Sequence, residues 1–486
     1  MPNHQRPNIV IFMADQLRAD ALGPFAPERR TAHTPVLDEL AARSTVFNDA
    51  FVQHPVCGPS RVSMMTGWYP HVHGHRTLTN LLKPWQPNLL RLAKDAGYNV
   101  CFAGRRGDVF APGVTEASTD VCGWLVRPRH GFSPSPFPEH SPPWNAMFVG
   151  RRNHDPADGP ILDFDEACVR TAEQWLADAP NGPWLLFVPL IFPHPPFEVE
   201  DPWFSLHTAN DMPPRIEPQN DKPAFHAALR SVKKFAFVEQ AQWADIQRTY
   251  YGMISRVDDQ LGRVLLAVER TGESDNTVTV FCSDHGEFAG DYDLVEKWPS
   301  GLDRSLTRTP LLIHDPRLTG GVVRSPVELV DILPTLAEMG DLTVGHTHFG
   351  RSLVPLLNDP ALPHRSFAVT EGGFRPTDVD LLEQPIPGPY EAKARLQRER
   401  PELVGLAVAL RTPTHTYVHR QEESGELYDR VADPEEIVNV ITDPAHAEVH
   451  RSLERALTRW LVETSDVIGW ELDPRFPSVP DGYRMT

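Results

Sequence analysis

Continuous apolar runs that end in polar residues constrain the fold of this chain more than any other feature. The run at residues 8–13 is followed by Asp15, and the run at residues 277–282 is followed by Asp284 and His285. Runs that are apolar at nearly every position, rather than at alternate ones, predict strands buried on both faces of a parallel sheet. Similar runs predict further strands at 98–102, 184–190 and 310–314.

Segments with the apolar spacing of helices separate these strands. They are expected at 35–44, 60–66, 88–96, 165–177, 240–269 and 327–339. Strands alternating with helices over most of the chain predict an α/β fold, in which helices sandwich a large, mostly parallel sheet. The stretches 107–163 and 197–235 lack this periodicity and are expected to be irregular loops.

The pattern changes near residue 365 to short strands, a turn-rich segment and one helix at about 446–463. We therefore predict a large domain at 1–364. A smaller C-terminal α+β subdomain at 365–486 would contain short antiparallel strands and a helix.

The charge balance excludes some classes of partner. The chain has 65 acidic and 46 basic residues, a formal net charge of −19, so it lacks the basic excess with which nucleic-acid and anionic-membrane binders neutralise phosphates. No apolar run is long enough to span a bilayer or to form a signal-peptide core, and we expect a soluble, cytoplasmic protein. The 5 cysteines include no CxxC pair, which argues against a disulfide framework or a structural zinc site.

The polar residues that end the apolar runs point to one common site. Ligands of open α/β sheets bind beyond the carboxyl ends of the parallel strands. Asp15, Asp284 and His285 all follow predicted strands, so the fold is expected to gather them at the same edge of the sheet.

A short segment between two of these elements carries the strongest motif. Cys57-Gly58-Pro59-Ser60-Arg61, followed by Thr66-Gly67, resembles the CxPxR…TG signature of sulfatases. Three further segments resemble that family in the same order along the chain. They are the helix at 256–265, the DxxPT motif at 331–336, and the ELYD…DPxE…N segment at 426–439.

The resemblance covers nearly the whole chain and implies the alkaline-phosphatase-like fold. It also implies that a formylglycine-generating enzyme converts Cys57 to formylglycine, whose hydrate attacks a small anionic sulfate ester. Arg61 would supply a fixed positive charge beside it. A bare cysteine in a loop before a helix is the alternative for this position.

The resemblance further implies a divalent metal ion held by residue 57 and two pairs of side chains. Oxygen ligands favour Ca²⁺, while Mg²⁺ or Mn²⁺ are alternatives. The ligands would be Asp15, Gln16, Cys57, Asp284 and His285.

Two other residues match family positions near the substrate. His194 would contact the sulfate or the leaving-group oxygen and donate a proton, and Lys297 would stabilise the anion. A loop histidine bonded to backbone and a solvated lysine are the alternatives.

The chain departs from the family at the GKxH segment, where it reads Gly104-Arg105-Arg106-Gly107-Asp108. Arg105 can replace the lysine charge and bind an anion with two N–H groups. The histidine has no counterpart, so Asp108, a histidine from elsewhere or altered chemistry must replace it. Formylglycine enzymes that cleave phosphonate monoesters and phosphodiesters also depart from GKxH.

Other residues carry weaker signals. His75 or Arg76 is expected to line the site. A group of arginines would either recognise an acidic group of the substrate or pair with surface acids, and the second is the more ordinary outcome. These are Arg106, Arg127, Arg129, Arg151 and Arg152.

The sequence thus supports a sulfuric ester hydrolase of the arylsulfatase kind. The alternatives are a phosphonate monoester or phosphodiester hydrolase on the same scaffold, and a non-catalytic anion-binding homologue with an unconverted Cys57. A homo-oligomer is possible under each of them.

Overall fold

A large mixed sheet forms the centre of the computed structural model, which describes residues 6–29, 31–104, 108–131, 147–385 and 387–467. Its strand order is β11-β2-β10-β9-β1-β7-β4-β5, and β9, β1, β7, β4 and β5 run parallel. The strand β10 is antiparallel to both of its neighbours. The bounds are β1 Asn8–Ala14, β2 Thr45–Phe47, β4 Asn99–Ala103, β5 Val121–Gly123, β7 Trp184–Pro189, β9 Thr277–Ser283, β10 Leu311–His314 and β11 Gly321–Val323.

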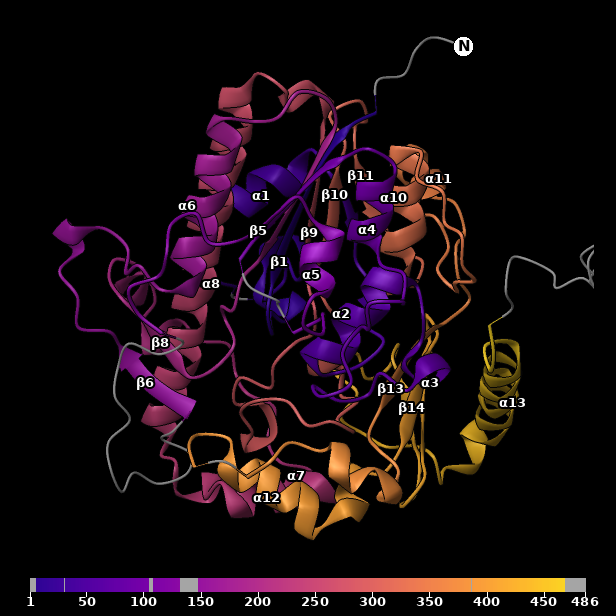
Figure 1. Ribbon diagram of the computed structural model, residues 1–486. Helices are drawn as coiled ribbons and strands as arrows, with labels where there is room; N and C mark the ends of the chain where they lie inside the picture. Colours follow the sequence, from indigo (N-terminus) through magenta and orange to yellow (C-terminus); the bar gives the residue numbers. More distant parts are fainter. Residues whose placement is uncertain (1–5, 30, 105–107, 132–146, 386, 468–486) are drawn as a thin grey trace, which may run out of the picture.

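Helices cover both faces of this sheet (Figure 1). The strand β1 shows why: Val10 and Phe12 point into one apolar core, and Ile9 and Ile11 point into the other. One face carries α1 Pro35–Ala42, α6 Phe164–Ala177 and α8 Gln240–Thr271. The other carries α2 Cys57–Thr66, α4 Leu89–Asp95, α5 Val114–Ser118, α10 Ile332–Gly340 and α11 Val354–Asn358. The predicted α/β sandwich is therefore confirmed.

A second, antiparallel sheet of four strands follows, in the order β13-β14-β15-β16. Its strands are β13 Ala368–Gly372, β14 Ala407–Arg411, β15 His415–Arg420 and β16 Glu426–Asp429. The same part of the chain contains the helices α12 Glu391–Glu399 and α13 Ala447–Glu463. These elements have the expected character, while the division at residue 364/365 stays a prediction.

Several expected boundaries are wrong in detail. The stretch 107–163 holds α5, β5 and β6 Phe148–Arg151, and the stretch 197–235 holds β8 Phe197–Val199 and α7 Ala224–Val232. The segment 327–339 begins with β12 Val327–Glu328, paired with β3 Ala50–Phe51, and a 3-10 turn before α10. The remaining short helices are α3 Pro70–His73 and α9 Arg304–Thr307. None of the described helices combines the length and apolar character needed to cross a bilayer.

The DxxPT motif and the C-terminal motif organise these connections. The buried Asp331 carboxylate accepts the backbone N–H groups of Glu328 and Arg351 and pairs with Arg365. In the C-terminal segment, the Asn439 side chain accepts the N–H of Leu427 at 3.0 Å. Both motifs therefore hold loops in place instead of contributing groups to the strand ends.

Candidate active site

The ends of strands β1 and β9 and the start of helix α2 meet at one buried cluster of side chains. The adjacent strands β1 and β9 pair through Ala14 and Ser283, so the residues that follow them, Asp15 and Asp284, are neighbours. The first residue of α2, Cys57, faces them. The ligand atoms of Asp15, Cys57, Asp284 and His285 all lie within 4.8 Å of one another, and all four side chains are buried.

The orientation of the His285 ring is informative. Its Nδ1 lies 2.8 Å from the carbonyl oxygen of Gly286, so Nδ1 carries the hydrogen and donates it. Its Nε2 therefore presents a lone pair, 3.6 Å from Oδ1 of Asp15 and 3.9 Å from Oδ1 of Asp284. Burial lowers the pKa of His285 to about 4, so the ring is neutral at neutral pH.

A lone pair facing carboxylate oxygens needs a cation between them. Nε2 of His285 and Oδ1 of Asp15 are both buried and have no hydrogen-bond partner among the described residues. Buried polar atoms without partners are rare, and they mark the place of an ion or water. A histidine that donates its other N–H to a backbone carbonyl is the usual form of a metal ligand.

Arg61 compensates part of the carboxylate charge. Its Nη2 lies 2.7 Å from Oδ2 of Asp15, and its Nε lies 2.6 Å from Oδ2 of Asp284. Burial and the charge of Asp284 raise the pKa of Asp15 well above its ordinary value. Burial also opposes ionisation of Asp284, but Arg61 outweighs it and holds the pKa of Asp284 below the ordinary value.

Gln16 links the two strand ends. Its backbone N–H donates to Oδ1 of Asp284 at 3.1 Å. Its φ of 68° is left-handed, a conformation that costs a non-glycine residue about 1 kcal/mol and is found mostly where the surroundings enforce it. Its side chain donates to Glu287 and accepts a hydrogen bond from Lys297.

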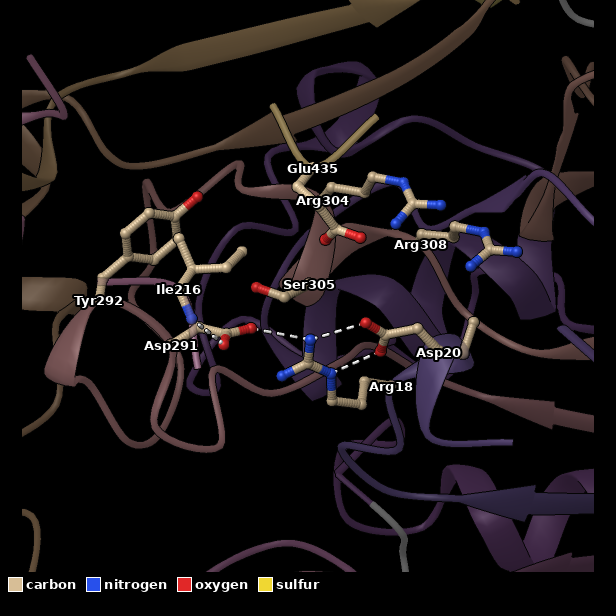
Figure 2. Close-up of a pocket in the computed structure, with 10 residues that line it drawn as sticks. Arg18, Asp20, Ile216, Asp291, Tyr292, Arg304, Ser305, Arg308 and Glu435 are labelled. Carbon is tan, nitrogen blue, oxygen red and sulfur yellow. Dashed lines mark hydrogen bonds and ion pairs between the residues drawn. The ribbon is translucent and has the colours of Figure 1, made fainter. Parts of the chain in front are cut away.

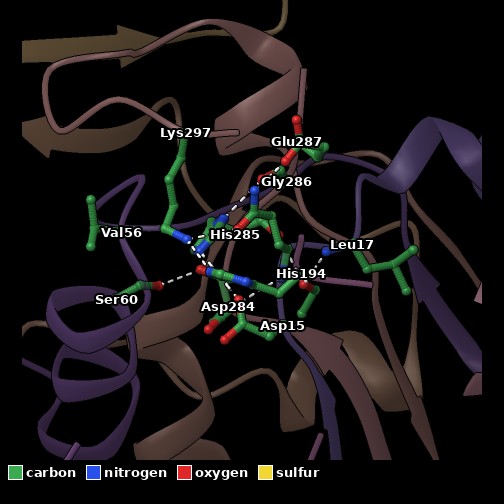
Figure 3. Close-up of polar contacts among 12 residues, drawn as sticks. Asp15, Leu17, Val56, Ser60, His194, Asp284, His285, Gly286, Glu287 and Lys297 are labelled. Atoms are coloured by element: carbon green, nitrogen blue, oxygen red, sulfur yellow. Dashed lines mark hydrogen bonds and ion pairs between the residues drawn. The ribbon is translucent and has the colours of Figure 1, made fainter. Parts of the chain in front are cut away.

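Lys297 and His194 lie beside the cluster (Figure 3). Nζ of Lys297 is 2.7 Å from Nε2 of His194, 2.7 Å from Oε1 of Gln16 and 3.0 Å from Oε1 of Glu296. Burial opposes the charge of Lys297, but Glu296 outweighs burial and raises its pKa above the ordinary value. Burial and Lys297 hold the pKa of His194 well below its ordinary value.

The hydrogen positions of this pair follow from these contacts. Nδ1 of His194 is 2.6 Å from the carbonyl oxygen of Pro195 and must donate to it. Nε2 then accepts from the Lys297 ammonium group. The proton that faces the site therefore belongs to Lys297, and His194 accepts it.

The side chains of Glu296 and Tyr390 were not foreseen from the sequence. Glu296 also pairs with Lys393, and the hydroxyl of Tyr390 donates to the carbonyl oxygen of Pro195 at 2.9 Å. Glu296 directly precedes Lys297 in the sequence, and this position could have indicated that the two side chains form an ion pair. Tyr390 lies 195 residues from Pro195 in sequence, and no local pattern marks it.

Asp108 lies close to the first turn of α2. A Cβ added to Gly58 would lie 3.0 Å from the backbone oxygen of Asp108, so this contact requires glycine. The charge of Asp108 also helps to raise the pKa values of Asp15 and Cys57, but its effect is smaller than that of burial. Its neighbours Arg105 and Arg106 lie outside the described residues.

Other predicted residues have structural partners instead. The Nδ1 of His75 lies 2.6 Å from the backbone oxygen of Asn80, and Nη2 of Arg76 pairs with Glu371 at 2.5 Å. Arg151 pairs with Asp201. The buried Arg152 pairs with Asp163, Glu198 and Glu200, while Arg127 and Arg129 are both exposed. The expected pairing with an acid near the surface is thus found for Arg151, whereas Arg152 is buried and pairs with buried acids.

A second charged pocket lies beside the loops that follow β1 and β9 (Figure 2). There Arg18 pairs with Asp20 at 2.5 Å and with Asp291 at 2.8 Å, and it donates to the backbone oxygen of Phe288. These contacts join the two loops that carry Asp15 and Asp284. The pocket therefore supports the position of the cluster.

Comparisons with known proteins find relatives along most of the chain. The protein-family model for sulfatases matches residues 7–342. A multifunctional alkaline phosphatase superfamily protein of Trinickia caryophylli is 26% identical, covering 95% of this chain and 96% of its own. A sulfatase of Formosa agariphila is 26% identical over 89% of this chain and 83% of its own. The crystal structure of a phosphonate monoester hydrolase of Agrobacterium radiobacter has a TM-score of 0.73 at 24% identity, covering 94% and 96% of the two chains.

Proposed function

The chain belongs to the sulfatase family of hydrolases, and on that premise we propose that it cleaves sulfate monoesters at the cluster around Cys57. One observation carries the proposal. The neutral Nε2 of His285 and the buried Oδ1 of Asp15 face each other next to the first residue of α2, and neither has a hydrogen-bond partner in the part of the chain that the structure describes.

A divalent metal ion fits this arrangement. Asp15 and Asp284 provide oxygen ligands, residue 57 would provide a further one after conversion, and His285 provides a nitrogen. The amide oxygen of Gln16, the fifth predicted ligand, accepts a hydrogen bond from Lys297 and would have to exchange it to bind the ion. Mostly oxygen donors favour a hard cation, and we propose Ca²⁺, with Mg²⁺ or Mn²⁺ as alternatives. When bound, the ion would polarise an oxygen of the ester and lower the pKa of an attacking hydroxyl.

The side chain of residue 57 requires conversion to act as proposed. Burial and the Asp15 carboxylate raise the pKa of the Cys57 thiol well above its ordinary value, so the thiol is neutral at neutral pH. A neutral thiol is a poor nucleophile and a poor ligand for a hard cation. A formylglycine-generating enzyme would replace it with an aldehyde whose hydrate supplies the attacking hydroxyl.

Lys297, held in place by His194, would stabilise negative charge on the leaving-group side of the site. Lys297 keeps its proton because Glu296 stabilises the ammonium group, so it can bind a sulfate oxygen. Nε2 of His194, 2.7 Å away, accepts a hydrogen bond from Nζ and holds the ammonium group in position. Tyr390 and the Pro195 carbonyl fix the ring of His194.

The charges favour a monoanionic substrate. Arg61, Lys297 and a divalent cation face the carboxylates of Asp15, Asp284 and Glu296, so four positive charges against three negative ones leave the site with one net positive charge. A sulfate monoester carries one negative charge, and so do a phosphodiester and a phosphonate monoester. The second candidate function is therefore hydrolysis of those phosphorus esters, and similarity to a relative described as multifunctional supports it.

A substrate panel tests both functions. Protein made together with a formylglycine-generating enzyme would be assayed with nitrophenyl sulfate, nitrophenyl phenylphosphonate, bis-nitrophenyl phosphate and the dianionic nitrophenyl phosphate. The highest kcat/KM on the sulfate supports the first function, and a phosphonate preference of orders of magnitude supports the second. Preference for the dianion contradicts the charge argument.

Two variants control this assay. Cys57→Ala should lower kcat on every substrate by at least ~10³-fold, as is usual when a nucleophile is removed. Cys122→Ala replaces the exposed cysteine and should leave kcat unchanged. A Cys57 peptide that still carries a plain thiol in protein made with the converting enzyme, found by mass spectrometry, would favour the non-catalytic alternative.

A further inference from the structure

A second group of metal-ligating side chains lies in the small antiparallel sheet. His415 is the first residue of β15, Asp429 is the last of β16, and His446 ends a 3-10 turn, Pro444–His446, that leads into α13. His415 and Asp429 stand directly opposite each other across the two strands. The ligand atoms of the three residues lie within 4.8 Å of one another, and all three residues are partly buried.

The hydrogen bonds of Asp429 and His415 leave one potential ligand atom on each of these two side chains. Oδ1 of Asp429 accepts the N–H groups of Val431 at 2.9 Å and Ala432 at 3.1 Å, which leaves Oδ2. Nδ1 of His415 lies 3.0 Å from Oγ1 of Thr414, which leaves Nε2. Ligands whose other atoms are already hydrogen-bonded are held in orientation, as in natural metal sites.

The two rings are close enough to share an ion. The centroids of His415 and His446 are 5.9 Å apart, with an angle of 64° between the rings.

We propose that His415, Asp429 and His446 bind a transition-metal ion of the Zn²⁺ class, with water completing the coordination. Two imidazoles and one carboxylate on a tetrahedral ion are an ordinary zinc ligand set. Zinc–ligand distances of about 2.0–2.1 Å place tetrahedral ligand atoms roughly 3.4 Å apart. Binding would therefore draw the three side chains together by small rotations.

The ion would fasten the start of α13 to the sheet. Farther along this helix, Leu453 and Trp460 pack into a core shared with Tyr69. The ring of Trp460 lies 4.8 Å from that of Tyr69, and Nε2 of His71 lies 2.8 Å from the carbonyl oxygen of Thr464. Tyr69 and His71 belong to the segment that follows α2. By stabilising α13, the ion would therefore also support this segment.

Zinc binding by variants tests this inference independently of the proposed function. Zn²⁺ would be titrated by calorimetry and equilibrium dialysis with excess Ca²⁺ present, in a background that carries Cys122→Ser because the exposed thiol also binds zinc. The variants are His415→Gln, Asp429→Asn and His446→Gln, which lie on different elements. The matched control is His419→Gln, an exposed histidine of the same strand β15.

The parent and the His419→Gln protein should bind one more Zn²⁺ per chain than the three ligand variants, or bind it at least ~100-fold more tightly. Zn²⁺ should also raise the Tm of the parent more than that of the ligand variants. Equal zinc stoichiometry, affinity and Tm shift in the parent and in His446→Gln would overturn the inference. If one ligand variant fails to fold, the other two still decide it.

Discussion

Arg61 offers a quantitative test of the charge balance at the cluster, because it pairs with both carboxylates at once. Its guanidinium lies 2.7 Å from Asp15 and 2.6 Å from Asp284, and all three side chains are buried. Arg61→Ala leaves two buried carboxylates without this partner, and breaking a buried ion pair costs about 3–5 kcal/mol. One of the two carboxyl groups can instead take up a proton, which limits the cost. Protonating a carboxyl group of ordinary pKa at pH 7 costs about 4.4 kcal/mol.

The expected loss is therefore about 4 kcal/mol in chelator. An unfolding entropy of about 2.1 cal/mol/K per residue over 486 residues makes this roughly a 4 °C fall in Tm. Because a divalent ion places positive charge between the same oxygens, Ca²⁺ should restore much of the loss. The Tm increase caused by Ca²⁺ should thus be larger in Arg61→Ala than in the wild type.

Differential scanning calorimetry in EDTA and in Ca²⁺ measures both quantities. Arg375→Ala is the control, since its side chain is 67% exposed and lies 3.8 Å from Asp378. Equal Tm values for Arg61→Ala and the wild type in EDTA would refute the charge argument. An equal or smaller Ca²⁺ response in the variant would refute the placement of the cation between Asp15 and Asp284.

Three further variants test other parts of the account. His285→Ala should weaken metal binding in equilibrium dialysis by at least ~100-fold, and unchanged metal content would exclude His285 as a ligand. Asp331→Asn should cost about 1–3 kcal/mol in chemical denaturation, because Arg365 loses one of its two buried carboxylate partners and keeps Glu328, while kcat stays within about twofold. Burial lowers the pKa of His207 in the folded protein to about 4, so as the pH falls the unfolded chain binds a proton at this residue before the folded protein does. The stability of the wild type should therefore fall relative to that of His207→Gln as the pH drops from about 6.5 toward 4. Parallel Tm curves for these two proteins would contradict that last expectation.

Much of the site could be predicted because strand order places it. Asp15 and Asp284 follow apolar runs, and in a parallel sheet the ends of such runs meet at one edge. Adjacent pairing of β1 and β9 then makes the two carboxylates neighbours. The same reasoning could not fix the start of α2. Pro59 is tolerated in the first turn of a helix, so it does not mark a boundary, and the helix begins at Cys57.

Contacts between distant segments were beyond prediction. Tyr390 reaches His194 from near α12, and no periodicity connects residues so far apart in sequence. The short helix α7 is amphipathic but only nine residues long, and it follows an irregular stretch that contains Pro213, Pro214, Pro218 and Pro223, so its pattern was not recognised. The left-handed backbone of Gln16 likewise depends on its bond to Asp284, which local sequence does not encode.

The dependence of turnover on conversion of residue 57 tests the central claim most directly. Preparations made with graded amounts of a formylglycine-generating enzyme would be assayed for kcat per chain on the preferred ester. The converted fraction of Cys57 would be measured in the same samples by peptide mass spectrometry. The account predicts a straight line through zero. Turnover that is independent of the converted fraction, or full activity of a preparation with an intact thiol, would contradict it.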